Sequence, residues 1–416
     1  MNNMKKPKIR FKGFTDDWEQ RKLGDVVERI TRKNQDLEST LPLTISAQYG
    51  LIDQNEFFDK RIASKDVSGY YLVRKGEFAY NKSTSSDAPW GAIKRLDRYE
   101  SGVLSTLYIV FRILDESQTD SDYLLSYYDT DLWHKDVQAI AAEGARNHGL
   151  LNIAPADFFE TTLMLPQDIE EQRLIGRYFM HLDKLITLHQ RKYEKLQIIK
   201  KSMLENCFPK NGEKVPKIRF SGFTGDWEQR KLGELGKARS GIGFPDAEQG
   251  GKEGVPFYKV SDMNNVGNEH EMVAANNHVT REQIARKGWK PIDEVPAIFF
   301  AKVGAAVLLN RKRLCRFPFL LDNNTMAYSI DGSALDADFA ITLFDTIDLT
   351  SLVQAGALPS YNSGDVEDID VVIPEMSEQR KIGTYFKRID SLITLHQSEL
   401  EKLQKIKKSL LERMFV

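Results

Sequence analysis

The chain has 416 residues, of which 41% are hydrophobic and 28% charged, and its formal net charge is −2. This composition is typical of a soluble globular protein of two or three domains and excludes a disordered or fibrous chain. The longest apolar run, Val295–Leu309, is too short to span a bilayer, so we expect no membrane segment. Two distant cysteines, Cys207 and Cys315, match no metal or redox motif and predict reduced thiols in a cytoplasmic protein.

A stretch near the amino terminus, PKIRFKGFTDDWEQRKLG at residues 7–24, returns at residues 216–233 with two substitutions. Such a repeat indicates a duplicated architecture. We interpret each copy as a packing clip that seals a module with aromatic and leucine side chains. In the first copy these side chains are Phe11, Phe14, Trp18 and Leu23. Base stacking by Trp18 and Trp227 is the alternative, and it is disfavoured because this motif is duplicated while the neighbouring blocks have diverged.

Two blocks, at about residues 25–165 and 235–373, follow the two copies of this motif and share almost no sequence. Only GEFAYNK at residues 76–82 and VPAIFFAK at residues 295–302 align loosely. Short β-rich runs occur beside a run with helical character, which predicts mixed α/β modules. The β-rich runs include residues 106–114 and 371–374, and the helical run covers residues 122–141.

A second repeat, at residues 171–208 and 378–415, has apolar residues at alternating spacings of three and four. This spacing predicts two long helices with a coiled-coil seam. The first seam is Ile175, Phe179, Leu182, Ile186, His189, Tyr193, Leu196, Lys200 and Met203, and the second is Ile382, Phe386, Ile389, Ile393, His396, Leu400, Leu403, Lys407 and Leu410.

The order of these segments favours an antiparallel pair of helices. The first helix leads from the first block to the second, and an antiparallel second helix returns beside it. Each helix would be roughly 57 Å long at 1.5 Å per residue. In such a pair His189 and His396 both approach the pseudo-two-fold axis, so we predict that they are neighbours. Their role is then to specify the register of the seam, and a pH switch is the alternative.

Candidate polar readers occur in both blocks. Arg and Asn are the side chains that make bidentate contacts to guanine and adenine edges, although Lys and Arg clusters are also ordinary solvated surfaces. Two Gly-bounded loops, at residues 143–153 and 356–364, occupy the same place ahead of the long helices. The candidates are Lys82, Ser83, Thr84, Arg95, Arg146, Asn147 and His148 in the first block, and Lys302, Arg311, Arg313, Tyr361 and Asn362 in the second.

No catalytic or metal motif is complete in the sequence. DAPW at residues 87–90 resembles an amino-methyltransferase signature, but Ala88 replaces a proline and no methyl-donor loop precedes it. The seven histidines show no metal-ligand spacing. We therefore expect a binding protein without a cofactor of its own, not an enzyme.

Together, the motif PKIRFxGFTxDWEQRKLG and the runs LPQDIEEQRLIGRYFMHLDKLITLHQ and IPEMSEQRKIGTYFKRIDSLITLHQ resemble the specificity subunit of type I restriction–modification systems. The resemblance spans the chain. It implies an α+β fold in which two target recognition domains read the halves of a bipartite site in double-stranded DNA. It assigns residues 1–170 and 209–377 to these domains and residues 171–208 and 378–416 to antiparallel spacer helices.

The resemblance also implies partners. Two methyltransferase subunits would dock on the spacer helices and carry S-adenosylmethionine, and motor-nuclease subunits would use ATP and Mg²⁺. A two-headed protein-binding adaptor and a self-sufficient methyltransferase remain alternatives. If the helices set the gap between half-sites, inserting one heptad should lengthen the unread spacer.

Overall fold

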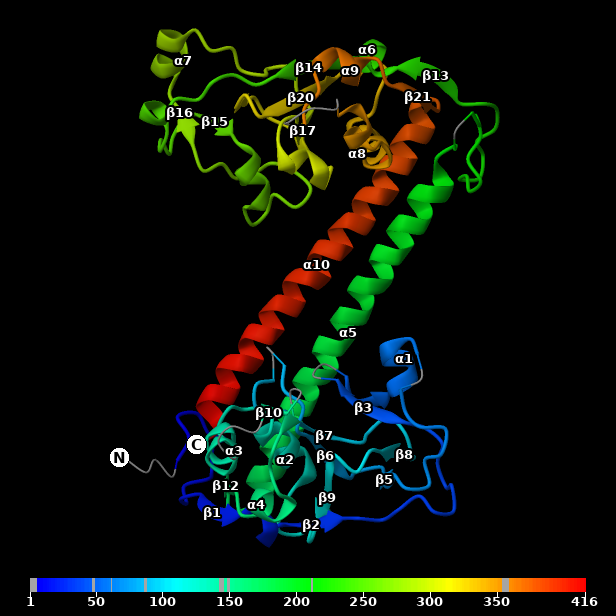
Figure 1. Cartoon of the computed structure of the whole chain (residues 1–416). Coiled ribbons are helices and arrows are strands. Elements are labelled where there is room, and N and C mark those ends of the chain that lie inside the picture. Colours follow the sequence, from blue (N-terminus) through cyan, green and yellow to red (C-terminus); the bar gives the residue numbers. More distant parts are fainter. Residues whose placement is uncertain are drawn as a thin grey trace. The chain divides into compact units, whose positions relative to one another are not determined.

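The computed structural model describes residues 6–46, 49–60, 62–85, 88–141, 146–147, 150–210, 212–353 and 359–416, with the backbone alone at 146–147. Its contacts divide the chain into two compact units. The first unit runs to Leu188 and includes Leu400–Val416, and the second is His189–Glu399. Two long helices, α5 (Ile169–Cys207) and α10 (Met376–Met414), contribute one part to each unit (Figure 1). This division differs from the expected boundaries, which followed the repeats along the sequence.

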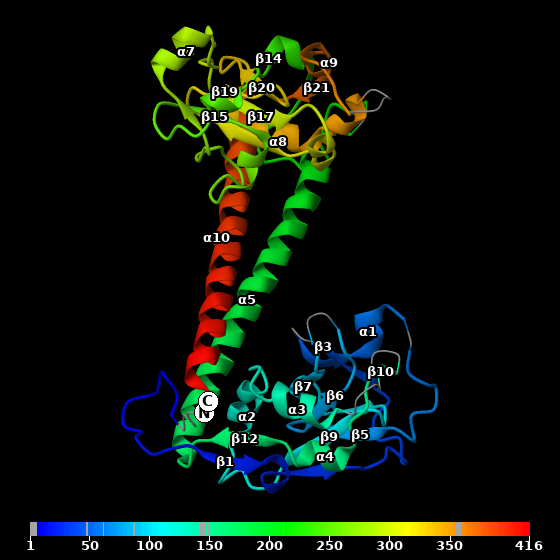
Figure 2. The ribbon, with the colours of Figure 1, turned by 60° about the vertical axis from the view of Figure 1, so that its left-hand side comes forward.

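The first unit contains a mixed domain, which we call head 1. A four-stranded antiparallel sheet in the order β2-β9-β6-β7 forms its centre. The smaller sheets β3-β4 and β5-β8 lie with α1 on the side away from α5 in Figure 2. The elements of head 1 are β1 (Glu19–Lys22), η1 (Leu23–Asp25), β2 (Val27–Ile30), β3 (Leu43–Ser46), β4 (Gly50–Asp53), α1 (Gln54–Phe58), β5 (Tyr71–Arg74), β6 (Phe78–Asn81), β7 (Ala92–Arg95), β8 (Ser101–Leu104), β9 (Ile109–Ile113), α2 (Ser121–Tyr127), α3 (His134–Ile140), β10 (Arg146–Asn147), β11 (Leu150–Leu151), α4 (Pro155–Phe159) and β12 (Thr162–Leu165).

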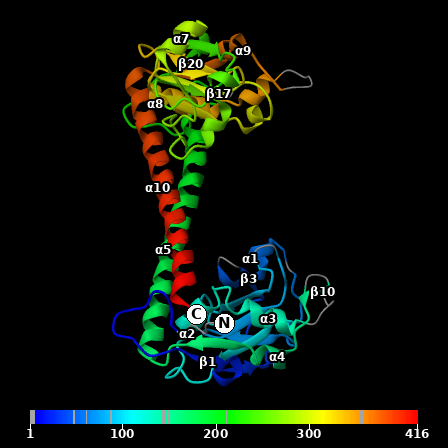
Figure 3. The same ribbon diagram turned by 90° about the vertical axis from the view of Figure 1, so that its left-hand side faces the viewer.

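The second unit contains head 2, whose central sheet has the order β14-β20-β17-β18. Helix α8 lies between this sheet and α10 (Figure 3). A separate lobe holds the sheet β16-β15-β19 and α7. The elements of head 2 are β13 (Glu228–Lys231), α6 (Leu232–Leu235), β14 (Gly236–Ser240), η2 (Asp246–Glu248), β15 (Val255–Tyr258), η3 (Val260–Asn264), β16 (His278–Val279), α7 (Arg281–Lys287), β17 (Ala297–Ala301), η4 (Ala305–Leu309), β18 (Lys312–Cys315), β19 (Leu320–Leu321), β20 (Thr325–Ile330), α8 (Ala337–Thr346), η5 (Leu349–Leu352), α9 (Ser363–Glu367) and β21 (Asp370–Ile373).

The two heads share a framework that their sequences hardly reveal. The loosely aligned runs GEFAYNK and VPAIFFAK end in β6 and β17, and these strands hold the same position in sheets of the same order. The strands β1 and β12 pair in head 1 as β13 and β21 pair in head 2. The expected helical run at residues 122–141 is instead two helices, α2 and α3. They are separated at a turn where the Thr130 hydroxyl donates to the Tyr127 carbonyl oxygen, a side-chain bond that competes with helix formation.

The long helices pair in antiparallel fashion. In the first unit the beginning of α5 lies beside the end of α10, where Asp183 contacts Lys407 at 2.7 Å. In the second unit the end of α5 lies beside the beginning of α10, where Lys200 contacts Asp390 at 2.8 Å. All the expected seam positions are buried or half-buried. The α+β fold with an internal repeat and two long antiparallel helices is thus confirmed.

The short repeated motif packs as a clip. Trp18 and Trp227 are each 1% exposed, which excludes base stacking by either indole. Trp18 contacts Tyr123 and Phe415 edge to face, and Trp227 contacts Phe208 in the same way. Each clip therefore joins a head to the end of a long helix.

An arginine of each clip is also paired with a buried carboxylate. Arg10 binds Glu171 through two hydrogen bonds of 2.5 and 2.7 Å, and Arg219 binds Glu378 through two of 2.8 and 2.7 Å. Both glutamates are fully buried at the starts of the long helices. Such bidentate pairs satisfy carboxylates that would otherwise be costly to bury. This requirement explains why the short motif and the long-helix motif are repeated together.

The predicted histidine pair forms in the second unit. The Nδ1 atoms of His189 and His396 are 3.1 Å apart, and the ring centroids are 5.1 Å apart. Two neutral imidazoles can share this hydrogen bond if one Nδ1 donates and the other accepts. Burial, then the neighbouring His189 and Lys192, lowers the pKa of His396. The environment thus favours the neutral ring, consistent with a polar register position in the seam.

Candidate functional site

Head 1 has a corner where the end of β6 meets a segment from later in the chain. Ser83 forms an isolated antiparallel bridge with Leu150, and Leu151 donates its backbone N–H to the carbonyl oxygen of Lys82 at 2.9 Å. This contact brings residues 150–153, the described end of the predicted loop, beside the predicted run Lys82–Thr84. We call residues 82–84 and 150–153 the first corner.

Head 2 has the equivalent corner at the end of β17. Val303 forms an antiparallel bridge with Ser360, and Tyr361 donates its backbone N–H to the carbonyl oxygen of Lys302 at 3.4 Å. We call residues 302–304 and 359–362 the second corner. The two predicted loops therefore occupy equivalent places in two heads whose sequences have diverged.

A half-buried lysine lies at the first corner. The Lys82 ammonium donates to the Ile153 carbonyl oxygen at 3.3 Å. Burial, with a smaller effect of Arg29, lowers the pKa of Lys82. Ser83 is exposed and Thr84 half-buried. The first corner thus combines the Lys82 ammonium, held by a backbone carbonyl, with the hydroxyl groups of Ser83 and Thr84.

The loop of the first corner is described only in part. Arg146 and Asn147 form β10, which pairs in antiparallel register with β11. His148 lies outside the described residues. The assignment of these three side chains to DNA binding stays a prediction.

Two predicted residues of the second corner serve the local fold. Tyr361 is 5% exposed, and its hydroxyl donates to the Ala301 carbonyl oxygen. Its expected role as a reader is therefore wrong, because the phenol is held in the core. Asn362 is exposed, but its side chain caps α9 by accepting from the Asp365 N–H at 3.1 Å. Lys302 is half-buried beside them.

The structure places Arg95 away from the first corner. It lies opposite Phe78, at the other end of β6 from Lys82. Its guanidinium binds Asp97 at 2.7 Å and Asp122 at 2.8 Å. Arg95 therefore orders the interior of the head, and its expected contact with DNA has no geometric support.

The two predicted arginines of head 2, Arg313 and Arg311, lie at different distances along β17 from the second corner. Arg313 lies opposite Phe299 in the middle of β17, and it donates to the Asn268 carbonyl oxygen at 2.6 Å. Burial lowers the pKa of Arg313. Arg311 comes just before β18, near the end of β17 that carries Lys302, and it donates to Asn264 at 2.8 Å. Of the two, Arg311 is the nearer to the second corner, since Lys312 beside it pairs with Phe300 near the end of β17.

One exposed cation of head 1 escaped the sequence analysis. Arg29 lies on β2, and its charge acts on the Lys82 ammonium. The two residues are far apart in the sequence, and Arg29 lies in the same row of the sheet as Phe78 and Arg95, at the other end of β6 from Lys82. The burial of β2 does not alternate, since Val27 is buried and Arg29 two residues later is exposed, so strand periodicity gave no signal for Arg29.

The side chains described at these corners are suited to binding. Among the described residues, no three His, Cys, Asp or Glu side chains are placed to hold a metal ion. Within the same residues, no helix has the length and apolarity needed to cross a membrane. Lysine and arginine beside hydroxyl and amide groups are the side chains that contact phosphates and base edges.

Comparison with known proteins identifies both repeats. A family model described as the type I restriction modification DNA specificity domain matches residues 15–197 and again residues 224–405. The two matches cover most of the chain and include both heads with the larger part of each following helix.

Two curated relatives come from Methanocaldococcus jannaschii. The type I restriction enzyme MjaVIII specificity subunit is 22% identical over 411 residues, which cover 95% of this chain and 91% of that protein. The putative MjaX specificity subunit is 21% identical over 424 residues, covering 98% and 95%. A solved structure of the type I restriction–modification S subunit from M. genitalium has the same fold, with a TM-score of 0.66, 14% identity and 99% of each chain covered.

Proposed function

Because the chain belongs to the family of type I restriction–modification DNA specificity subunits, we propose that its two heads read the two halves of one bipartite, asymmetric DNA site. The observation that carries this proposal is the pair of equivalent corners. Each presents a lysine and a loop at the same place on a shared framework, whereas the loop sequences differ. Unlike heads on a duplicated framework suit a site whose halves have different sequences.

In this proposal the corners contribute two kinds of contact. Lys82, Lys302 and the neighbouring Arg311 bind phosphates or guanine edges, and Arg146 and Asn147 read bases of the first half-site. Phosphate contacts release counterions, so binding should weaken steeply with salt. Changing Arg146 or Asn147 should alter the first half-site only, and a uniform loss over all sequences would mark them as phosphate contacts.

We also propose that methyltransferase subunits dock on the long helices. Large apolar side chains face outward there in both units. They are Leu174, Tyr178, Leu188 and Ile406 in the first unit and Ile198, Leu392 and Leu395 in the second. Exposed apolar groups on a helix are typical of protein–protein contacts. The partners would carry S-adenosylmethionine, and motor-nuclease subunits would use ATP and Mg²⁺, while this chain acts in the cytoplasm without catalysing either reaction.

Co-expression of the full chain with a methyltransferase subunit of its own system tests the proposal. Genome-wide sequencing of modified bases should give a bipartite motif with two unlike halves and an unread spacer. Modification that follows no such motif would contradict it.

The adaptor hypothesis makes the opposite prediction for DNA retention. An adaptor complex would hold DNA without sequence preference or not at all. Salt-dependent, sequence-selective retention of DNA by the complex of this chain and its methyltransferase excludes the adaptor.

A further inference from the structure

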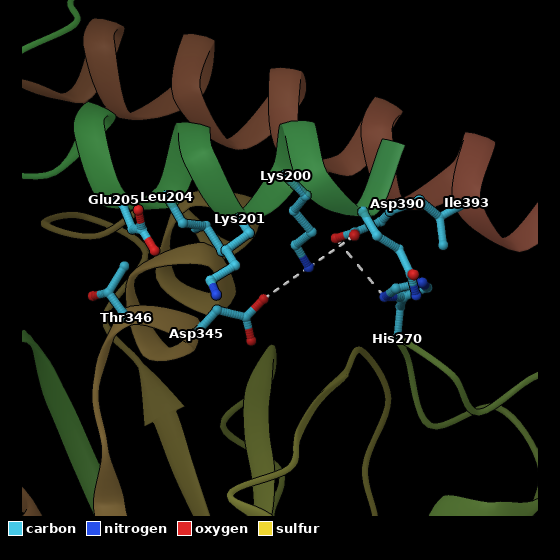
Figure 4. Close-up of a pocket in the computed structure, with 10 residues that line it drawn as sticks. Lys200, Lys201, Leu204, Glu205, His270, Asp345, Thr346, Asp390 and Ile393 are labelled. Atoms are coloured by element: carbon cyan, nitrogen blue, oxygen red, sulfur yellow. Dashed lines mark hydrogen bonds and ion pairs between the residues drawn. The ribbon is translucent and has the colours of Figure 1, made fainter. Parts of the chain in front are cut away.

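A lysine in the second unit joins three parts of the molecule. The Lys200 ammonium on α5 lies 2.8 Å from Asp390 on α10 and 3.0 Å from Asp345 on α8 of head 2. Figure 4 shows the ammonium between the two carboxylates, with His270 on the other side of Asp390. Burial lowers the pKa of Lys200, but the two carboxylates outweigh burial and raise it. The lysine therefore stays charged and binds both helices to the head.

The first unit repeats this arrangement with different partners in the head. Lys407 on α10 lies 2.7 Å from Asp183 on α5 and 2.6 Å from Asp129, which follows α2 of head 1. Both the lysines and the helix aspartates are separated by the period of the long repeat, since 407 − 200 = 207 and 390 − 183 = 207. We call each set of one lysine and two aspartates a lysine clamp.

Each clamp acts at the carboxyl-terminal end of a helix whose amino-terminal end is also fixed. Gln172 accepts a hydrogen bond from the Asp120 N–H just before α2, and Gln379 accepts one from the Asp336 N–H just before α8, both at 2.9 Å. Beside these bonds, α5 touches the backbone of α2 through Gly176. Both α2 and α8 are thus attached to the long helices near both of their ends.

The clamped end of α8 packs into the core through Leu343 and Phe344 and borders open space at Asp345. A pocket of about 570 Å³ lies beside the second clamp, lined by Lys200, Asp345, Asp390, His270 and further residues of α5. Side chains therefore leave space where α8 meets α5, and the ion pairs bridge it. Half-buried ion pairs contribute little net stability but restrict geometry, because they are satisfied only at one separation.

We propose that Lys200 and Lys407 are positioning residues that fix the angle at which each head presents its corner to DNA, so that each lysine determines the selectivity of one half-site. The inference rests on the proposed half-site reading. Neither lysine touches DNA, because each is enclosed by the aspartates of its own clamp.

The test uses Lys200→Met and Lys407→Met in the full chain, co-expressed with the methyltransferase subunit, with modified-base sequencing as the readout. Each variant should lose about tenfold in discrimination against single-base mismatches in one half-site. The two variants should affect opposite halves, so each is the control for the other. Lys200→Arg should restore the discrimination that Lys200→Met loses.

A further variant separates positioning from stability. Lys200→Met with Asp345→Asn and Asp390→Asn removes the clamp without leaving unpaired carboxylates. If the clamp positions head 2, this variant keeps the melting temperature and still relaxes one half-site. If selectivity returns together with the melting temperature, the clamp only stabilises the unit and the proposal is wrong.

Two other outcomes are decisive. Unchanged discrimination in both lysine variants overturns the clamp proposal and leaves half-site reading intact. If wild-type protein shows no bipartite motif, the proposed function fails first, and that outcome is seen before any variant is made.

Discussion

In the first unit Asp129 of the clamp also binds Lys94 at 2.7 Å, whereas in the second unit His270 stands near Asp390 at 3.8 Å. The two lysines lower the pKa of Asp129 to about 2, although burial opposes them. The central lysine with its two aspartates is common to both units, and the surrounding charges differ.

The same contrast runs through both heads. Four contacts between head and long helix occur in both units. They are an arginine bound to a buried glutamate, a glutamine that accepts a backbone N–H before a head helix, a glycine packed against that helix, and a clamp lysine. The corners keep their backbone pairing but change their side chains. The two units have thus kept the contacts that attach each head to the long helices, whereas the side chains at the corners have diverged.

The largest effect should follow from replacing the clip arginine that pairs with a buried glutamate. Arg10→Met leaves Glu171 buried without its partner and should lower the free energy of unfolding by about 3–5 kcal/mol. Arg219→Met should do the same through Glu378. Urea unfolding followed by tryptophan fluorescence measures both. Equal stability of wild type and either variant would show that the glutamate finds another partner.

The close approach of helix and head gives the next largest effect. A Cβ atom on Gly383 would lie 2.5 Å from the Phe339 backbone nitrogen, and one on Gly176 would lie equally close to Tyr123. We expect Gly383→Ala to destabilise the second unit by about 1–3 kcal/mol, despite the better helix propensity of alanine. Gly243→Ala is the control, because nothing lies within 4 Å of its added Cβ. A thermal melt in which both variants behave alike would contradict the close packing.

The corners should show a smaller and selective effect. Lys302→Ala should weaken binding to its half-site by about 1–3 kcal/mol or reduce the salt dependence of binding, and Lys82→Ala should act on the other half. Fluorescence anisotropy of the methyltransferase complex with DNA at several salt concentrations measures both quantities. If both substitutions act on the same half-site, the corners are not equivalent readers.

The smallest effect should come from the histidine pair. The pKa of His396 is lower in the folded protein than its ordinary value near 6.5, so the folded state resists protonation. Stability from this group is present above pH 6.5 and falls as the pH drops below it, by less than about 1 kcal/mol for so open a site. Melting temperatures of wild type should therefore decline more between pH 7.5 and 5.5 than those of His189→Leu with His396→Leu. Parallel declines would show that other groups govern the acid response.

Some residues that the sequence assigns to DNA binding have structural roles instead. Tyr361 and Arg95 are residue types that can contact DNA. In the fold, however, the Tyr361 side chain is buried and the Arg95 guanidinium binds two aspartates. Residue type identifies what a side chain can bind, whereas its partners in the fold decide whether it is free to bind it.

The sequence by itself determined the duplication, the two long helices, their seam and the meeting of His189 with His396, because repeats and heptad spacing are local properties of the chain. Only the tertiary structure decided which glutamate each clip arginine binds, which corner each loop joins and where Lys200 and Lys407 find their carboxylates. These contacts join segments far apart in the chain, and their geometry depends on the order of strands and the packing of helices, which spacing along a sequence does not encode.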